Sequence, residues 1–552
     1  MKTRRSYYYG QIVQGLEYNP RLFLYLLIFA VVLVYAYQFA SQVSTQWMVA
    51  GFASLGILAG LAIMVWPFQA VMLYLGLAIW YHAFLRGETM VGMGSALVYP
   101  GDVFVGAFLV VEFFRGCMRQ THLYTATDRW MVALYAWALC CVTRGVFEYG
   151  YSSIGESREF LHCISYFIAI HYVTRVEQTD SVLRWLKWIA VISSVYQVYN
   201  FVFVNQFSPR FAGGGPLAVF ASLNVVVLAV LLGRDHIKKT LSMLPIAAAV
   251  GCIALAGGLY FLIEYTGEAA VIWLKIPIGA CLVWATAIIL QYRVPAAIAL
   301  MLQFALVLYS SQRASTMCVL ATIPFLLWIG RRHFLKAVLL IGMSVTLFIA
   351  WLAFMNPTFG GQLIPYMQKQ FTGIVAPHED PTAAWRLYGW RWEMERIFSN
   401  PFWVLIGQGF GGYYDWYFNL TDAVIRTAPH NVYVQIWSKQ GFVGLGLFGA
   451  VLLSFFRSGF RFLIRSQNEL HRSIMMILML EVFGNLVNQI GGQFVASLWV
   501  VLALGTVLPR LWLAEQPGSS AIRTGATSPL HHREQARTLP RSPTLISQRL
   551  HS

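Results

Sequence analysis

Arginine and tryptophan residues suited to holding a phosphate-bearing molecule stand close together in one stretch of the chain. Arg386 and Trp390 are four residues apart, so on a helix they would share one face. The guanidinium group is a rigid fork that matches phosphate oxygens, and Trp390 could hold it stacked. The alternative is that Arg386 only pairs with Glu393 on a solvated helix face. The spacing leaves both interpretations open.

His430 is the second candidate, in Ala428-Pro429-His430-Asn431, directly before a long apolar run. An imidazole acts as base or acid near neutral pH, and this position suits a substrate with one end in lipid. A single histidine is more often structural. The glycines from Gly407 to Gly412 lack the Gly-Lys-Ser/Thr of a P-loop. They indicate either tight turns or a close backbone approach to a ligand.

Arg313 is the third candidate, among small residues in Ser310-Ser311-Gln312-Arg313-Ala314-Ser315. A charge near the hydrocarbon is costly, about 2.5–3.5 kcal/mol at mid-bilayer by insertion scales, so an arginine here needs a reason. The reason could be a ligand or simple snorkelling to head groups. Lys275, Glu481 and His162 also lie in or beside apolar runs and are weaker candidates, because buried pairing would explain them equally well.

Membrane spans are the elements that must position these residues. Of the 552 residues, 58% are apolar and 11% are charged, and the mean hydropathy is +0.61. A soluble protein carries about a quarter charged residues, so the composition excludes a soluble enzyme, a disordered chain and a coiled coil. Apolar runs near the length of about 20 residues that crosses a bilayer follow one another along the chain. We expect an all-α, polytopic transmembrane helical bundle of about 13–16 spans.

The apolar runs differ in how clearly they reach that length. Clear runs include Trp47–Trp66, Trp185–Val204, Met243–Ile263, Val271–Leu290, Phe334–Phe354, Val432–Phe455 and Phe494–Leu513. Shorter runs include Phe68–Leu85, Val103–Phe114, Met131–Val142, Phe160–Val173 and Ile474–Leu486.

Basic residues near the ends of the spans predict the orientation, because Lys and Arg are retained on the cytoplasmic side. Lys2, Arg4 and Arg5 place the N-terminus inside, and five later basic loops fall on the same side. Most of the net charge of +16 is therefore an orientation signal, and we expect no nucleic-acid partner. The seven cysteines show no metal-ligand spacing, so we interpret them as small core residues. We expect no metal and no cofactor.

Four parts follow from this organisation. They are an N-terminal transmembrane bundle (1–355), a long external loop with the candidate residues (356–430), C-terminal transmembrane helices (431–514) and a disordered basic cytoplasmic tail (515–552). A long connection in a compact membrane protein is usually functional or disordered. Here Asp380-Pro381 predicts a helix start, the helix runs from Thr382 to Phe398, and Asn400-Pro401 ends it.

Together these pieces resemble the signature region of the O-antigen ligase and Wzy polymerase superfamily. The matching segments are Arg386-Leu-Tyr-Gly-Trp390, Ile397-Phe-Ser-Asn-Pro401, Gly407-Gln-Gly409, and His430-Asn431-Val-Tyr433 with Gly441 and Gly444. Ser311-Gln-Arg313-Ala-Ser315 is similar to the family's upstream arginine motif. Two positions depart from the pattern: Ala314 replaces a frequent glycine, and Lys439-Gln440 stands where an acidic residue is common.

The resemblance implies a GT-C-like membrane glycosyltransferase. Such an enzyme moves a glycan from undecaprenyl diphosphate to an acceptor hydroxyl at the periplasmic face of the bacterial inner membrane. The charge pattern described above places both termini of this chain in the cytoplasm. By the same resemblance, His430 is the general base or orients the hydroxyl, and Arg313 and Arg386 bind the diphosphate and offset its charge. Supporting positions are Asn431, Trp390, Arg391, Gly407 and Gly409. The resemblance further implies inversion at the anomeric carbon without a metal.

The chemical nature of the acceptor distinguishes three possible activities. Another carrier-linked repeat makes a polymerase of O antigen or exopolysaccharide, a lipid A core makes a ligase of lipopolysaccharide biosynthesis, and a protein hydroxyl makes an O-oligosaccharyltransferase. We favour the polymerase. A polysaccharide or lipid-linked glycan transporter would also explain the spans, but transporters place charged groups near the midplane, whereas the candidates here gather at one face. The expected partners are the lipid-linked donor, the acceptor and the bilayer.

Overall fold

The computed structural model describes residues 63–84, 91–93, 96–98, 100–115, 125–150, 152–199, 247–252, 381–412, 414–418, 423–425, 430–490 and 495–514, with a few isolated positions between them. Arg313, Lys275, the predicted tail and several predicted spans lie outside these residues.

Helices follow the predicted apolar runs closely. The helices of the bundle are α4 (Pro67–Phe84), α5 (Pro100–Arg115), α6 (Ala126–Tyr149), α8 (Ile164–Tyr172), α9 (Gln178–Tyr199), α19 (Val432–Arg465), α20 (Glu469–Gln489) and α21 (Ser497–Ala514). Among the residues that the structure describes, α6, α19, α20 and α21 are long and apolar enough to cross a membrane. These findings confirm the all-α polytopic membrane fold.

One predicted run is divided in two. The run Phe160–Val173 is split between α7 (Ser152–Leu161) and α8, with a turn at His162 and Cys163. At this turn the ring of His162 lies between two side chains from other helices, with Nε2 at 2.9 Å from Asp102 and Nδ1 at 3.0 Å from the Tyr74 hydroxyl. These buried pairings fix the turn, and they also explain why a histidine stands in an apolar run.

The exposed fraction of the side chains distinguishes helices at the centre of the bundle from those at its lipid-facing surface. Almost the whole of α21 is buried, as expected of a helix that is apolar on every side and surrounded by others. By contrast, Phe147 on α6 and Leu453 and Ile464 on α19 are 87%, 71% and 76% exposed. In a membrane protein such exposed apolar side chains contact lipid, so α6 and α19 lie at the margin of the bundle.

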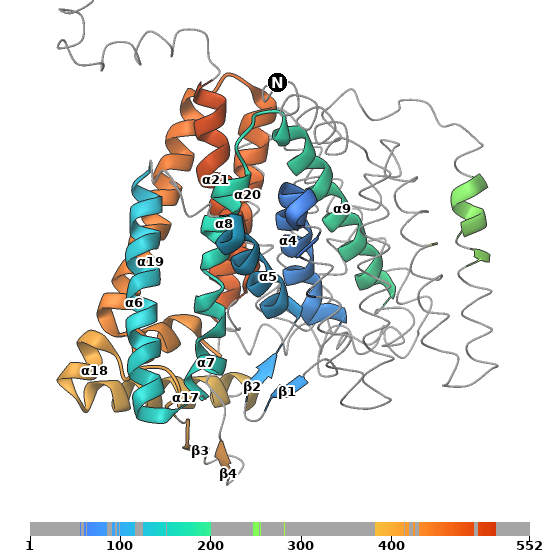
Figure 1. Cartoon of the computed structure of the whole chain (residues 1–552). Coiled ribbons are helices and arrows are strands. Elements are labelled where there is room, and N and C mark those ends of the chain that lie inside the picture. Colours follow the sequence, from blue (N-terminus) through green and yellow to red (C-terminus); the bar gives the residue numbers. More distant parts are fainter. Residues whose placement is uncertain are drawn as a thin grey trace, which may run out of the picture.

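The helices α6 and α19 run side by side in opposite directions (Figure 1). Near one end Thr127 bonds to Ser454 (3.0 Å), and further along the Trp137 Nε1–H donates to the carbonyl of Gln440 (2.8 Å). This pair joins the N-terminal part of the chain to the part that carries His430. The first residue of α19 therefore lies at the end of the bundle where α6 finishes.

A small layer of short elements covers that end (Figure 1). Its elements are α7, α17 (Pro381–Phe398), α18 (Pro401–Ile406) and two antiparallel hairpins, β1 (Val91–Met93) with β2 (Ala96–Val98) and β3 (Trp416–Phe418) with β4 (Ala423–Ile425). The predicted helix from Thr382 to Phe398 is confirmed as α17. Its predicted end is also confirmed, because Asn400 caps the next helix by accepting from the N–H of Phe402 at 3.0 Å.

Two glycines allow the chain after α18 to lie directly on α19. Gly407 and Gly441 have φ of +72° and +70°, which side chains with a Cβ rarely adopt. A Cβ on Gly407 would overlap the backbone of Lys439 and Gln440, and one on Gly441 would overlap the backbone at Leu405. The N–H of Gln408 donates to the Ser438 carbonyl at 2.7 Å, and α19 is kinked at Gly441. The start of the glycine-rich stretch, at Gly407, therefore packs backbone against backbone on α19.

We expect Gly407→Ala and Gly441→Ala each to destabilise the protein by about 2–5 kcal/mol, because positive φ and overpacking act together. Thermal unfolding of the purified protein in detergent measures the effect. Gly446→Ala is the matched control: it lies in α19 with open space around the added methyl, so it should stabilise by up to about 1 kcal/mol. Equal shifts of the unfolding temperature for all three variants would contradict the close contact of Gly407 and Gly441 with the facing backbone.

Candidate functional site

His430 stands immediately before α19, at the end of the bundle covered by the short elements. The next residue, Asn431, is the N-cap of α19: its Oδ1 accepts from the N–H groups of Tyr433 (3.0 Å) and Val434 (3.2 Å). This cap fixes the chain direction just after His430. The half-buried imidazole thus has the predicted place at the mouth of a span, and its role stays a prediction.

Helix α17 brings the first arginine candidate to the same place. The ring of Trp385, the neighbour of Arg386, lies 5.4 Å from the ring of His430 and 5.4 Å from that of Trp416. Arg386 and Trp390 are half-buried. The buried Nε1 of Trp390 has no hydrogen-bond partner among the described residues. Arg386 thus lies on the helix whose Trp385 contacts His430, whereas Arg313 lies outside the described residues.

Aromatic side chains hold the β3–β4 hairpin against α17. Trp416 and Phe418 point inward and are 1% and 2% exposed, whereas Tyr417 between them is 54% exposed, as the alternation of a strand requires. Phe418 makes an edge contact with Tyr388 of α17, with ring centroids 5.7 Å apart. The sequence analysis did not predict this hairpin. The alternation covers only three residues and is too short to be distinguished from a loop.

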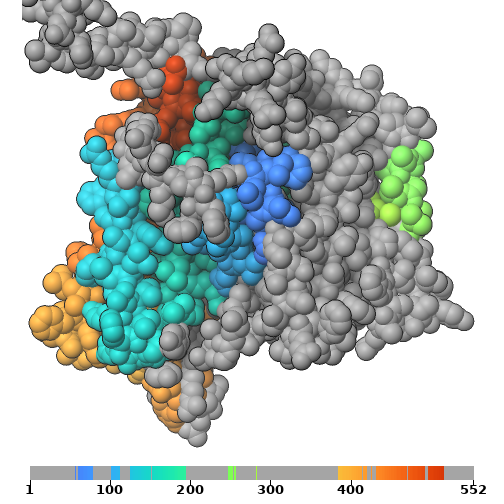
Figure 2. All heavy atoms as spheres, viewed as in Figure 1, coloured from blue at the N-terminus to red at the C-terminus, as the bar shows by residue number. Residues whose placement is uncertain are grey.

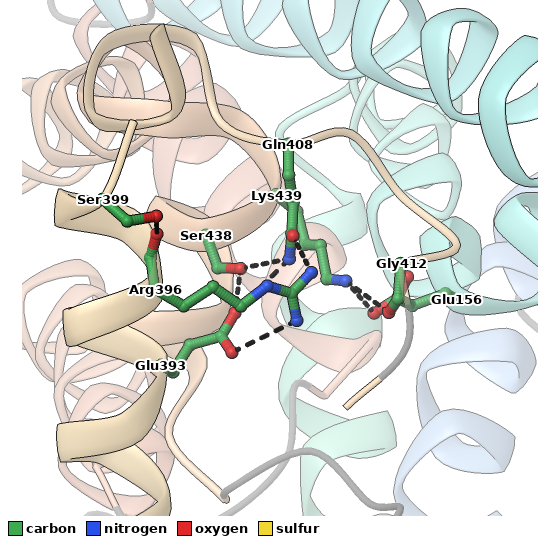
Figure 3. Close-up of polar contacts among 8 residues, drawn as sticks. All are labelled: Glu156, Glu393, Arg396, Ser399, Gln408, Gly412, Ser438 and Lys439. Atoms are coloured by element: carbon green, nitrogen blue, oxygen red, sulfur yellow. Dashed lines mark hydrogen bonds and ion pairs between the residues drawn. The ribbon is translucent and has the colours of Figure 1, made fainter. Parts of the chain in front are cut away.

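Glu393, on the buried side of α17, is the centre of a polar cluster (Figure 3). Its carboxylate accepts from the Ser438 hydroxyl and, at 3.4 Å, from the Gln408 amide. Arg396 donates to the Gln408 carbonyl oxygen and lies 3.8 Å from Glu393. The sequence offered Glu393 as a partner for Arg386. The structure gives it Arg396 as a basic neighbour.

Lys439 is the centre of an adjoining cluster (Figure 3). Its side chain is 2% exposed, and its ammonium group lies 3.0 Å from Glu156 of α7 and donates to the Gly412 carbonyl at 2.9 Å. The same group lies 4.3 Å from the centre of the Tyr414 ring, within range of a cation–π interaction. Burial, with Glu156 and Glu393 nearby, holds the pKa of Tyr414 well above its ordinary value, so the phenol stays neutral.

These contacts join the family signature to helices from elsewhere in the chain. Glu156 also accepts from the N–H of Gly411, and Arg144 of α6 donates to the Gly407 carbonyl at 2.6 Å. Sequence reasoning missed Arg144 and Glu156 because their partners lie more than 250 positions away along the chain, and it missed Arg396 although its partners Glu393 and Gln408 are near in sequence. The available signal was Lys439 itself, a charge inside an apolar run at a position where the family pattern has an acid.

The remaining predicted residues have simpler surroundings. Gly407 and Gly409 pack against α19 and α6. Arg391 is 78% exposed and pairs with Glu395 at 2.8 Å on the outer side of α17. Glu481, another weaker candidate, is buried on α20 and accepts from the amide of Asn485 at 2.9 Å. The described part of the chain contains no group of three metal-ligating side chains, and independence from metal stays a prediction.

Comparison with known families bears directly on this end of the molecule. Residues 296–449 match the family model Wzy_C, described as O-antigen ligase. This segment is similar to an O-antigen ligase domain, and we refer to it below as the Wzy_C domain. The Wzy_C domain includes α17, α18, the β3–β4 hairpin, His430 and the first half of α19, and it also spans Arg313. No curated protein and no solved structure matches the chain.

O-antigen ligases, which this segment resembles, are membrane enzymes of the glycosyltransferase kind that act on a lipid-linked glycan and an acceptor. The domain boundary divides the polar clusters of Figure 3. Glu393, Arg396 and Lys439 lie within the domain, whereas Glu156 comes from α7, far outside it. The N-terminal helices are therefore part of the framework that holds the Wzy_C domain.

Breaking the buried pair tests this framework. We expect Lys439→Met to destabilise by about 2–4 kcal/mol, below the loss for a fully buried pair because Glu156 is partly exposed. Glu156→Gln should also destabilise, and the double variant should lose less than the two singles together. Thermal unfolding in detergent measures all three. Glu395→Gln, which removes the exposed ion pair with Arg391, should leave the unfolding temperature unchanged. Strictly additive losses would contradict the pairing.

Proposed function

We propose that the protein transfers a glycan from undecaprenyl diphosphate to an acceptor hydroxyl at the periplasmic face of the inner membrane, as a Wzy-type polymerase of O antigen or exopolysaccharide. The contact between the rings of His430 and Trp385, with Arg386 next along α17, carries this proposal. This contact supports the proposal because His430, a possible base, touches α17, the helix that carries Arg386, and both residues lie in the segment that resembles O-antigen ligase.

The proposed reaction uses each group for one task. His430 accepts or orients the proton of the acceptor hydroxyl, whose oxygen forms a bond to the anomeric carbon. The bond from that carbon to the diphosphate breaks, so the configuration at the carbon is inverted. Arg386 and Arg313 bind the diphosphate oxygens and stabilise the charge that develops on the departing carrier. No metal is needed, since the two guanidinium groups supply the positive charge.

The distribution of charge on α19 supports a periplasmic location. His430 precedes the first residue of this helix, whereas Arg457, Arg461 and Arg465 lie near its other end. Basic residues beside a span are retained in the cytoplasm, so the His430 end is external. A hydroxyl acceptor and a lipid carrier would meet there at the membrane boundary.

Purified wild-type and variant proteins in vesicles with lipid-linked repeat units test the enzyme proposal. We expect His430→Ala to lower kcat about 10²–10⁴-fold, as loss of a general base does. Arg386→Lys keeps the charge but loses the bidentate fork, so it should weaken transfer by about tenfold or more. Arg472→Lys, on an exposed residue at the far end of the bundle, is the control. Full activity of His430→Ala would remove the base assignment. Substrate movement without release of carrier diphosphate would identify a transporter.

Deletion of the gene distinguishes the acceptors. A polymerase mutant should carry surface glycans of a single repeat, because transfer of one unit continues while chain growth stops. Electrophoresis of extracted surface glycans shows the ladder directly. An uncapped lipid A core would identify a ligase instead, and intact glycans beside unglycosylated proteins would identify an O-oligosaccharyltransferase. Either of the last two results would overturn the polymerase proposal while leaving glycosyl transfer in place.

A further inference from the structure

The short helix α18 is apolar along its whole length, yet none of its residues is buried. Its sequence is Pro-Phe-Trp-Val-Leu-Ile, and Phe402 and Leu405 are 72% and 54% exposed. Two further apolar residues lie beside it: Phe398, just before α18, is 58% exposed, and Phe442, on α19, is 59% exposed. We call these four residues the α18 patch. The amber atoms of the α17–α18 region form the margin of the molecule beside α6 (Figure 2).

Three half-buried tryptophans surround the patch. The Trp437 Nε1–H donates to the Val404 carbonyl at 3.0 Å, and its ring meets that of Phe398 at 5.6 Å. The Arg396 guanidinium lies 5.4 Å from the Trp392 ring and 5.8 Å from the Trp403 ring. Tryptophan gathers at the boundary between membrane and water, where its apolar ring and its N–H both find suitable surroundings.

The position of α18 along α19 gives its depth. The backbone at Leu405 lies against Gly441, so α18 is level with Phe442. The exposed residues Arg457 and Arg461 follow Phe442 by about 22–28 Å, at about 1.5 Å per residue. The hydrocarbon layer is about 30 Å thick, and arginines reach its edge by snorkelling. Phe442 and the α18 patch therefore lie at the outer edge of the hydrocarbon.

We propose that the α18 patch is inserted in the outer leaflet of the membrane, with Phe402 and Leu405 among the acyl chains and the three tryptophans at head-group level. Lipid is the occupant because the patch continues the lipid-facing surface of α19 at the same depth as its outer boundary. Its four side chains carry no charge, as insertion requires. The proposal depends on the membrane fold and is independent of the transfer reaction.

A photoreactive side chain tests the insertion in the full-length protein. Benzoylphenylalanine replaces Phe402, an aromatic position, and the protein is irradiated in its native membrane. We expect lipid adducts in the mass spectrum of the purified protein. Tyr417, which is 54% exposed on β3, is the matched control and should give few such adducts. Cross-links from position 402 to a second copy or to another protein, no adduct at all, or equal lipid labelling at both positions would each overturn the proposal.

A charge in the patch should displace it from the membrane. With the photoreactive group at position 405, we expect Phe402→Glu to reduce lipid adducts severalfold, because a carboxylate disfavours the hydrocarbon edge. Phe402→Leu keeps the apolar character and should leave the adducts unchanged. If both substitutions have the same effect, shape rather than insertion controls the labelling, and the proposal fails. Neither measurement depends on glycan transfer, so failure here would leave the proposed function untouched.

Discussion

Compensation of one buried charge constrains the arrangement of the whole end of this bundle. Lys439 lies 2% exposed on a helix that crosses the membrane. Burying an uncompensated ion costs several kcal/mol, so its ammonium group must find an anion and further acceptors. Glu156 and the carbonyl of Gly412 meet that need. As a result, α7 must lie against α19, and the glycine-rich turn must pass between them.

The candidate site depends on this arrangement from two sides. Arg386 lies two turns before Glu393 on α17, and His430 lies about two turns before Ser438 and Lys439 on α19. The Glu393–Ser438 hydrogen bond connects these two helices directly, and Arg396 donates to Gln408 in the stretch between α18 and α19. Reacting groups must be held within a fraction of an ångström, and an error of about 1 Å can cost about 10²-fold in rate. The buried polar clusters are therefore suited to positioning the groups that would touch the substrate.

Local patterns predicted the parts of the structure that depend on neighbours in sequence. The apolar runs gave the helices, Pro381 and Asn400 gave the limits of α17, and His430 was placed at the start of a span. The partners of Lys439 could not be predicted, because Glu156 is 283 positions away and no periodicity relates them. The break at His162 was missed for the same reason: its cause lies in Asp102 and Tyr74, on two other helices. Hydropathy predicts which residues are buried, but it does not predict which distant residue each of them contacts.

The kink in α19 bears on how far His430 stands from the membrane surface. Along a straight helix, His430 would stand about 18 Å beyond Phe442, at about 1.5 Å per residue. The head-group layer is only about 5–8 Å thick on each side, and the diphosphate of a lipid carrier belongs near it. The kink at Gly441 falls between the two residues, so the first turns of α19 take a direction independent of the span below. The contact of Gly441 with the chain after α18 fixes that direction, which explains why glycine is required on both sides of it.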